Sequence, residues 1–524
     1  MANLISITPT GTAPEVDWLA DLQSTVDSIF EPIATWSTDI VFYAVEIGGF
    51  SMPIVVAWLI VAAVVFTIYF GFIQFRGLKT GWDVVRGRYS SADDPGEIPH
   101  FQALTSALSG TVGLGNIAGV GAAMALGGAG ATFWMILAGL LGMATKFAEC
   151  TLGVKYRKVH EDGTVSGGPF SYLPVAFKKF PKVLSVGLTG LFAVAILLFG
   201  VGGGNMFQAN QTFAQARQVT GGQDGFLGSD TAAFIFGLIL AVLVGVVLIG
   251  GIKSIGKVTS RLVPSMALIY VAACLFVILS NLANVPAAIG EIFEGAFTAA
   301  GVGGGVIGVM IVGFQRAAFS NEAGLGSAPI AHSAVKTRRP VSEGFVALYE
   351  PFVDTVVVCT MTALTIVIAG APSFAAGREQ VEAGEGTPDG VILTSDAFET
   401  FLPWFPYVLA VAVALFAFST LITWAYYGLK AWNYLFGRSR TKDNVYKVIF
   451  CFFTLTGTIL TFGQVLNFAD AMLFVCAFVN LLGVYLLLPV IKNEMRQYLA
   501  DRKSGRLLQL GLEDRDKEIP ADRI

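Results

Sequence analysis

"TVGLGNIAGV", residues 111–120, lies inside a stretch whose composition is otherwise that of a membrane helix. About 210 residues further on, "EAGLGSAPIA", residues 322–331, repeats its Gly-Leu-Gly centre. Glycine in a helix interior costs roughly 1 kcal/mol relative to alanine, and it permits backbone angles that other residues avoid. We therefore expect both helices to unwind here and to release carbonyls and amides from their intrahelical partners.

The composition places the chain among polytopic membrane proteins. Of its 524 residues, 54% are hydrophobic and only 13% are charged, and the mean hydropathy is +0.69. A soluble protein of this length would carry roughly twice that charged fraction. The five cysteines lack metal-ligand spacing, so we expect small buried side chains there. The first residues show no basic patch followed by an apolar core, so we expect no signal peptide.

Apolar stretches long enough to cross ~30 Å of hydrocarbon predict the transmembrane helices. There are eleven of them, near residues 52–74, 101–127, 130–154, 183–214, 231–252, 260–281, 303–330, 343–370, 405–433, 446–463 and 466–491. Residues 17–34 have the pattern of an amphipathic helix at the membrane interface, and the next apolar piece, 39–50, is too short to cross.

The basic residues predict the orientation. With the N-terminus outside, 29 of the 33 Lys and Arg residues fall in cytoplasmic segments, and the first 50 residues carry seven acids and no Lys or Arg. This distribution agrees with the positive-inside rule. We therefore expect a multi-pass protein of the cell inner (plasma) membrane, with an extracytoplasmic segment at 1–50 and a cytoplasmic tail at 492–524.

The two interrupted segments indicate an inverted repeat. Residues 101–123 and 314–334 both begin Phe-Gln and reach Gly-Leu-Gly within a dozen residues, and five spans separate their starts. We expect an all-α membrane protein with one additional helix at 51–75, a first five-helix repeat at 101–281 and a second, inverted repeat at 303–491. Inverted repeats with a discontinuous first helix are typical of secondary transporters. The alternative is that these glycines only permit close helix packing.

Several stretches carry a resemblance to a known family. They are "GNIAGV" (115–120), "FWMILAGLLGMATKFAE" (133–149), "GGPFSYL" (167–173), "FSNEAGLGSAPIAH" (319–332), "DTVVVCTMTAL" (354–364) and "LFAFSTLITWAYYG" (415–428). With these stretches, which cover most of 100–490, the chain resembles the alanine/glycine:cation symporters, also called sodium:alanine symporters. The resemblance implies a fold of the leucine-transporter type with an added span, and amino-acid uptake coupled to sodium or protons. One departure is Leu429, where the family often has an acid after "YYG".

A site for an amino-acid zwitterion needs donors for the carboxylate, acceptors for the ammonium group and a wall that sizes the side chain. The polar and aromatic candidates near the breaks and in the third repeat-one span are Thr105, Ser109, Gly110, Gln208, Asn210, Thr212, Phe314, Gln315, Phe319, Ser320 and Asn321. The resemblance adds Trp424 as a wall that restricts the pocket to small side chains. From its position alone, Trp424 is as well explained as an interfacial anchor.

Sodium prefers oxygen ligands from carbonyls, hydroxyls and carboxylates. By the resemblance, a hydroxyl pair in the eighth repeat span faces carbonyls at the first break. The predicted cation site therefore combines Ser419 and Thr420 with Thr111, Val112 and Gly115, and Asn116 is a weaker candidate. The alternative for the two hydroxyls is hydrogen bonding to carbonyls of their own helix.

Two cations lie within predicted spans, where each costs roughly 2.5–3.5 kcal/mol on insertion scales. For Lys146 we favour a local ion pair with Glu149, three residues on. Arg316 and Glu322 flank the second break and are candidates for gating or pairing.

The remaining charged candidates follow the second break. Glu350 and Asp354 lie four apart on one helix face and could bind a cation or a proton, or pair with Lys146 or Arg316. His332 is expected near the cytoplasmic end of its span, as a structural residue or in a proton role.

The leading hypothesis is a symporter that imports small neutral amino acids with sodium as the coupling ion and without an organic cofactor. Proton coupling is the nearest alternative. A channel would need a continuous polar pore, and a sensor or membrane enzyme would need a catalytic or nucleotide motif that the short cytoplasmic loops lack. The expected partners are the amino acid and the lipid bilayer, with no nucleic acid. The exact amino acid and the oligomeric state are left open.

Overall fold

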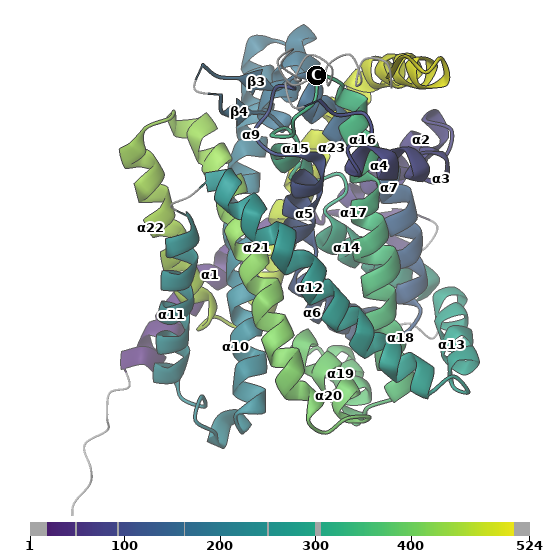
Figure 1. Ribbon diagram of the computed structural model, residues 1–524. Coiled ribbons are helices and arrows are strands. Elements are labelled where there is room, and N and C mark those ends of the chain that lie inside the picture. The colour runs from purple at the N-terminus through teal and green to yellow at the C-terminus, as the bar shows by residue number, and fades with distance from the viewer. Residues whose placement is uncertain are drawn as a thin grey trace, which may run out of the picture.

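The computed structural model describes residues 18–47, 50–91, 94–161, 163–248, 251–298 and 305–507. The expectations for the first 17 residues, for residues 303–304 and for the tail beyond 507 fall outside this part of the chain. Helices dominate the described residues (Figure 1). The strands among them form two small antiparallel hairpins, β1–β2 and β3–β4.

In the part of the chain that the structure describes, seven helical segments are long and apolar enough to cross a membrane. They are Ala131–Lys155 (α7), Lys182–Val219 (α9, the π turn η3 and α10), Asp230–Leu248 (α11), Ile252–Ser280 (in α12, Gly251–Ser280), Pro340–Ala369 (α16 to α18), Phe405–Phe436 (α21) and Phe462–Lys503 (α23). A bent pair, His100–Thr111 (α5) with Leu114–Gly127 (η1 and α6), makes an eighth. The class of all-α membrane protein is therefore confirmed, whereas the number eleven stays a prediction.

The other helices are shorter or less apolar. They are α1 (Trp18–Val41), α2 (Ile54–Tyr69), α3 (Ile73–Arg76), α4 (Leu78–Val85), α8 (Pro169–Ala176), α13 (Val285–Phe297), α14 (Gly305–Asn321), α15 (Ala328–His332), α19 (Pro372–Glu382), α20 (Gly390–Glu399) and α22 (Arg440–Gly457). The acidic stretch near 378–399, which the sequence predicts as a solvated hairpin or as short helices, forms short helices.

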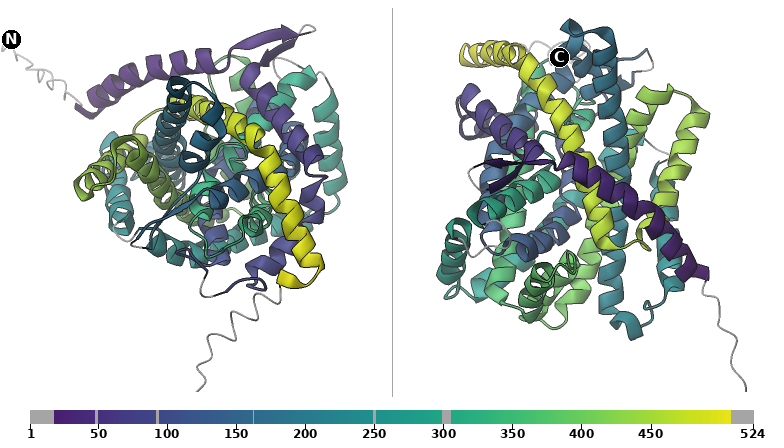
Figure 2. Two further views of the ribbon diagram at one scale, coloured as in Figure 1. Left: turned by 90° about the horizontal axis from the view of Figure 1, so that it is seen from above. Right: turned by 180° about the vertical axis from the view of Figure 1, so that it is seen from behind.

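The N-terminal prediction needs a correction. The helix expected at 17–34 runs from Trp18 to Val41 and lies obliquely against α23 (Figure 2). Residues 39–50 are not a separate apolar piece, because they end this helix and lead into a hairpin that pairs Ala44–Ile47 (β1) with Phe50–Pro53 (β2).

At the first break, glycine is needed because another helix, α21, approaches the backbone closely. Helix α5 ends at Thr111, Val112 and Gly113 leave the helical region, and one 3-10 turn leads into α6 at a bend of 56°. Gly113 has φ −134°, which any residue can adopt, so the angle does not require glycine. Glycine is required instead by the lack of space, because a Cβ at this position would lie 2.4 Å from Thr420 Oγ1.

At the second break, the backbone adopts positive φ angles that interrupt the helix. Helix α14 ends at Asn321, and α15 begins at Ala328. Between them Gly324 has φ +96° and Gly326 has φ +85°, which side chains disfavour. Glu322 has φ +56° although it is not glycine, a conformation that costs of order 1–2 kcal/mol.

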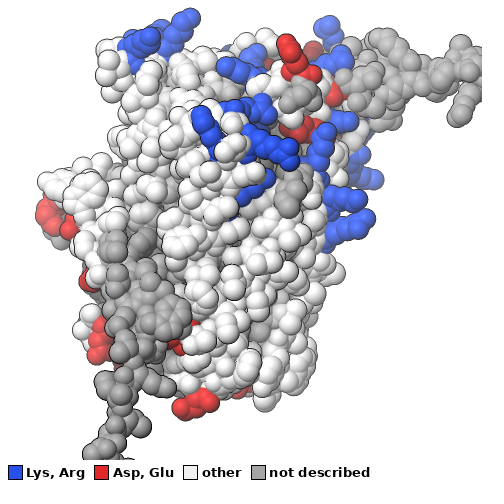
Figure 3. All heavy atoms as spheres, turned by 90° about the vertical axis from the view of Figure 1, so that its left-hand side faces the viewer, with Lys and Arg blue, Asp and Glu red and all other residues white. Residues whose placement is uncertain are grey.

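Both breaks lie in the interior of the bundle. Every residue of 103–125 and of 316–335 is buried. Helix α7 packs on α14 and α16, helix α5 packs on α12 and α21, and α9 packs on α21 and α23. Basic side chains gather at the end of the molecule that carries the C-terminal end of α23, with a few acidic ones among them, and the side chains of charged residues visible toward the opposite end are acidic (Figure 3).

Candidate functional site

The two breaks meet in the centre of the molecule. A Cβ on Gly115 would lie 3.3 Å from Ser320 Cα, so the first break touches the end of α14 directly. Asp354, in the π-helical segment η5 (Phe352–Cys359), joins them. Its Oδ1 accepts a hydrogen bond from Asn116 Nδ2 (2.8 Å), and its Oδ2 accepts one from Ser320 Oγ (2.7 Å). One buried carboxylate therefore holds the first break against the second.

Two further polar residues complete this group. Thr355 Oγ1 donates to Asp354 Oδ2 (2.7 Å) and accepts from Asn321 Nδ2 (2.9 Å). Asn321 Oδ1 accepts from Ala323 N (2.9 Å), inside the second break. We call Asn116, Ser320, Asn321, Asp354 and Thr355 the break cluster. All five residues are at most 1% exposed.

Helix α21 meets the first break through the Thr420 hydroxyl and the Ser419 carbonyl. Thr420 Oγ1 donates to Ser109 O (3.1 Å), and Ser109 Oγ donates to Ser419 O (2.7 Å). Both hydroxyls also donate to Phe416 O of their own helix, at 2.9 Å for Ser419 and 3.1 Å for Thr420. The predicted meeting of α21 with the break is therefore present, together with the self-bonding that the alternative proposed.

Gln208 links the first break to the π turn η3 between α9 and α10. Its Oε1 accepts from Leu114 N (3.1 Å), and its Nε2 donates to Gly203 O (3.0 Å) in the π turn η3 (Gly202–Met206). Thr212 only donates back to Gln208 O (2.6 Å). The side chain of Gln208 therefore supplies a partner for a backbone N–H that the unwinding would otherwise leave unpaired.

Trp424 lies against both breaks and is only 1% exposed, so its interpretation as an interfacial anchor is wrong. Its Nε1 donates to Gly110 O (3.3 Å) and to Glu322 Oε1 (3.1 Å). A Cβ on Gly204 would lie 2.2 Å from Trp424 Cγ, so the indole packs directly on the π turn. The Phe199 ring, 4.7 Å away between centroids, continues this aromatic wall.

Some predicted residues lie away from the centre. Thr105 donates to Phe101 O (2.9 Å) within its own helix. Thr111, by contrast, borders the first break as the last residue of α5, but its Oγ1 donates to Ala107 O (3.4 Å) of the same helix. Phe314 faces α2 and α7, and Gln315 is half-buried two turns before the second break. The side chain of Asn210 donates to Gly457 O and Leu460 O, beside a cavity described below.

The charged residues pair across helices rather than along them. Lys146 Nζ donates to Glu350 Oε2 (3.1 Å), so the favoured pair with Glu149 is wrong. Glu149 instead accepts from Asn480 Nδ2 (2.5 Å), which also donates to Gly324 O (2.8 Å). Sequence spacing alone could not distinguish these partners, because α17 (Tyr349–Pro351) and α23 are brought to α7 only by the fold.

A chain of buried charges extends from this pair. His332 contacts Glu350 through Nε2 and Glu343 through Nδ1 (2.6 Å), and His100 Nδ1 contacts the other oxygen of Glu343. We call His100, Glu343, His332, Glu350 and Lys146 the buried charge chain. His100 and Glu343 were not among the predicted site residues. Histidine is rare in this chain, with three in total, and this is the one signal that could have pointed to His100.

The expectation that Glu350 and Asp354 act together from one helix face is not met. The π-helical segment begins at Phe352, between them, and they join different groups, the buried charge chain and the break cluster. Cys150, His332 and Glu350 could converge on one metal ion. The Lys146 ammonium group 3.1 Å from Glu350 opposes this, because it already supplies the positive charge.

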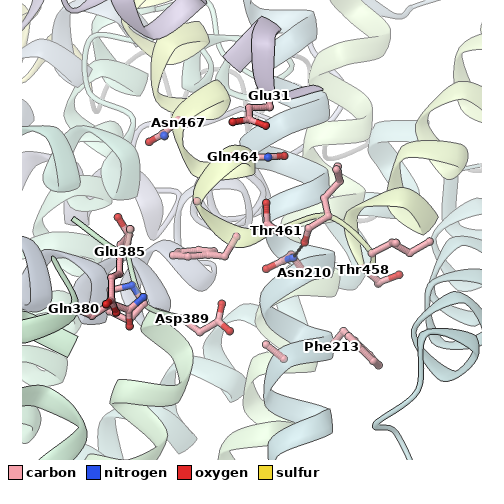
Figure 4. A pocket seen from close by; sticks show the side chains of 18 of the residues that line it. Glu31, Asn210, Phe213, Gln380, Glu385, Asp389, Thr458, Thr461, Gln464 and Asn467 are labelled. Atoms are coloured by element: carbon pink, nitrogen blue, oxygen red, sulfur yellow. Dashed lines mark hydrogen bonds between the residues drawn. The ribbon is translucent and has the colours of Figure 1, made fainter. Parts of the chain in front are cut away.

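A cavity of about 830 Å³ opens beside α10, the loop before α20 and the start of α23 (Figure 4). Asn210, Asp389 and Phe462 are among the residues that line it. Phe462 lies 5.8 Å from Phe207, which lies 5.0 Å from Phe319 at the end of α14. These three rings separate the cavity from the break cluster.

Known proteins resemble this chain in sequence and in fold. The sequence profile of the sodium:alanine symporter family matches residues 38–510. The sodium/alanine symporter AgcS of Methanococcus maripaludis is 36% identical over 86% of this chain and 95% of its own length. A putative sodium/proton-dependent alanine carrier, YrbD of Bacillus subtilis, is 31% identical over 93% and 94%. MhsT in complex with L-phenylalanine has a similar fold, with a TM-score of 0.50 at 15% identity over 74% of this chain and 88% of its own.

Proposed function

The chain belongs to the sodium:alanine symporter family, and on that premise we propose that it imports alanine or glycine together with sodium. As a member of this family it is a multi-pass membrane transporter and not an enzyme. The observation that carries the proposal is the buried meeting of two interrupted helices around Asp354, because backbone groups freed at membrane depth are suited to hold a small zwitterion and its ion.

The amino acid is bound between the two breaks. Ser109, Gly110 and Gln208 border it from the first break and α10, and Phe319, Ser320 and Asn321 border it from α14. Trp424 closes the site from α21. The support is steric, because the indole, the Phe199 ring and the π turn fill the space that a longer side chain would need. Thr105, Thr212, Phe314 and Gln315 lie outside this site.

Sodium is held by oxygen atoms on both faces of the first break. One group consists of the Ser419 and Thr420 hydroxyls with carbonyls of Thr111, Val112 and Gly115. The hydrogen bond from Thr420 to Ser109 O supports it, since it brings α21 within bonding distance of the unwound turn. A second group is Asp354 with Asn116 and Ser320, where a carboxylate at the centre of the break cluster supplies negative charge.

The remaining architecture follows from the same proposal. Eleven spans are arranged as α2 plus two inverted five-helix repeats that begin at α5 and α14. The N-terminus is outside and the basic end of the molecule faces the cytoplasm, in agreement with the positive-inside rule. The cavity at the opposite end is then the extracellular access route. Alternating access moves the helices of the two breaks against the others around the site.

The direct test is uptake of labelled alanine into proteoliposomes under an imposed sodium gradient, an imposed proton gradient or neither. Accumulation that requires the sodium gradient supports the proposal, and accumulation driven only by protons supports the alternative coupling ion. Accumulation with neither gradient, or no uptake of alanine or glycine at all, contradicts it. The double variant Ser419→Ala, Thr420→Ala should weaken the sodium dependence far more than it lowers the melting temperature.

A further inference from the structure

A second pocket, at the basic end of the molecule, is lined by cations. It has a volume of about 190 Å³ and lies where the β3–β4 hairpin (Lys158–Val159 with Val165–Ser166) meets α8 and the last turns of α21. Lys158 in β3, Lys430 in α21 and Arg438 just after α21 line it, and none of the described residues in its lining is acidic. Figure 1 shows the hairpin at the same end of the molecule as the C-terminal end of α23.

The charges in this pocket are arranged differently from those in the interior of the bundle. The cations predicted within spans are each paired with a carboxylate, Lys146 with Glu350 and Arg316 with Asp470. The pocket instead gathers three cations and has no carboxylate in its described lining. A concave surface that carries charge of one sign attracts ligands of the opposite sign, so the pocket favours an anion.

The hairpin holds two of these cations in position. Lys430 Nζ donates to Val165 O (3.0 Å) in β4. Arg438 Nη2 donates to Thr164 Oγ1 (3.4 Å), directly before the same strand. Asn433, three residues after Lys430 on the same face of α21, adds a neutral amide to the lining. The cationic groups therefore converge from α21 and from the hairpin on one small volume.

Apolar surface continues from one side of the pocket. Phe170 on α8 stacks on Tyr434 of α21, with ring centroids 5.4 Å apart, and both residues line the pocket. Tyr434 is 41% exposed, and Val175, one turn after the lining residue Ser171 on the same face of α8, is 40% exposed. In a membrane protein such side chains face the lipid, and tyrosine is typical of the level of the headgroups.

We propose that this pocket binds the headgroup of an anionic phospholipid. The phosphate accepts hydrogen bonds from Lys158, Lys430 and Arg438, and the acyl chains extend over the apolar rim at Tyr434 and Val175. A basic pocket between transmembrane helices, open to the lipid on one side, meets both requirements of such a ligand. A zwitterionic lipid binds more weakly, because its headgroup brings a cation of its own into a pocket that is already positive.

Two alternatives predict different results. A solvated basic face attracts anionic lipids through its total charge, so removing any two cations from that face weakens the binding equally. A site for a soluble phosphate shares the cations of the pocket, but it gains nothing from the apolar rim, so a water-soluble phosphate ester binds it as well as the lipid does.

The test is thermal unfolding of the purified full-length protein in detergent at about 0.15 M salt, which screens long-range attraction. The protein is titrated with dioleoylphosphatidylglycerol, with dioleoylphosphatidylcholine or with glycerol 3-phosphate. We expect the melting temperature to rise saturably with phosphatidylglycerol and to change little with the other two. Equal stabilisation by phosphatidylcholine, or by glycerol 3-phosphate at the same concentration, overturns the inference.

Paired variants separate the pocket from the total charge. Lys430→Gln with Arg438→Gln should raise the half-saturating concentration of phosphatidylglycerol about tenfold or more. Lys178→Gln with Lys179→Gln is the matched control, because it removes the same charge from exposed lysines shortly after α8 that are not in the lining, and it should stay within about twofold. If the first pair does not fold, because Lys430 also holds the hairpin, Lys158→Gln with Arg438→Gln decides instead. Equal weakening in the pocket and control variants overturns the inference in favour of a solvated basic face.

Discussion

Gly113→Ala should damage sodium coupling mainly through its contact with Thr420, since the next group that the new Cβ approaches is Gln208 Oε1, at 3.3 Å. The backbone at Gly113 has φ −134° and ψ −150°, which alanine can adopt, so backbone strain does not contribute. The added Cβ would lie 2.4 Å from Thr420 Oγ1, whereas ordinary contacts begin near 3.4 Å. The Thr420 hydroxyl must therefore move by about 1 Å, away from Ser109 O and from the proposed ion position.

The size of the effect follows from the cost of overpacking a buried contact, which is about 1–3 kcal/mol. If the whole cost lowers the affinity for sodium, the half-saturating sodium concentration rises about 5- to 150-fold, because about 1.4 kcal/mol corresponds to a factor of ten. The assay is alanine uptake into proteoliposomes over a range of external sodium concentrations. Sodium-induced stabilisation against heat gives an independent measurement if uptake is too slow.

Gly119→Ala is the matched control in the same broken helix. A Cβ at Gly119 would meet only Leu114 O, at 4.0 Å, so the substitution fits without displacement. Its sodium dependence should stay within about twofold of the wild type, because exposed or well-accommodated substitutions usually change free energies by less than about 0.5 kcal/mol. A Gly113→Ala protein with the sodium dependence of Gly119→Ala would refute the assignment of Thr420 to the cation site.

Three further predictions address the other contacts of the site. Asp354→Asn removes the charge that joins the breaks and should raise the half-saturating sodium concentration more than tenfold in the same uptake assay, while Asp389→Asn, in the cavity, should change it less than threefold. Trp424→Phe keeps the wall but removes the donor to Gly110 O and Glu322 Oε1, and should raise the KM for alanine roughly tenfold, at about 1–3 kcal/mol for a lost buried partner. Lys146→Met leaves Glu350 without its cation and should destabilise the protein by about 3–5 kcal/mol in thermal melts, and Glu350→Gln in the same chain should recover part of that loss.

The sequence was sufficient to predict the breaks and their burial because glycine placement is a local signal. Both Gly-Leu-Gly segments interrupt helices, and both lie in the interior. The reason for each glycine was not local. Gly113 is required by the approach of Thr420 from a helix more than 300 residues away, whereas Gly324 is required by its own angle of φ +96°. Only the second kind of requirement is a property of the residue itself.

The partners of the charged residues could be predicted only as alternatives, because they come from different helices. Pairing of Glu350 with Lys146 was one of these alternatives, and it is the pair that forms. Spacing along α7 favoured Glu149 for Lys146, but the fold brings Glu350 to 3.1 Å. Spacing along the next span placed Glu350 and Asp354 on one face, and a π-helical segment between them changes the register. A deviation of this kind leaves no clear pattern in the amino-acid types, so helical periodicity assigned the two acids to one site.

The contacts of α21 suggest how the proposed site is coupled to movement. Ser419 and Thr420 bond to Ser109, and Trp424 bonds to Gly110 O and to Glu322. The broken helices form one set, in which α14 and α15 pack mainly on α7, while α21 with α9, α10 and α22 forms the other; α5 packs directly on α21 and on α12, so it lies at the boundary between the two sets. Any sliding of one set against the other must break these few hydrogen bonds, and it must also disturb the hydrogen bond that helps hold Glu322 at its strained φ of +56°.

An ion and an amino acid bound at the same boundary would therefore bias the movement directly. A ligand shifts a conformational equilibrium only by its differential affinity for the two states. Oxygen ligands contributed by both α21 and the first break satisfy that condition, because they surround the ion only when the two surfaces are together. The buried charge chain does not satisfy that condition, because its residues all lie on one side of the boundary. They belong to helices α5, α7, α15, α16 and α17, and α21 contributes none of them. If the protein works as proposed, the buried charge chain stiffens the set of helices that carries the breaks. The coupling between ion, amino acid and movement then depends on the contacts of α21.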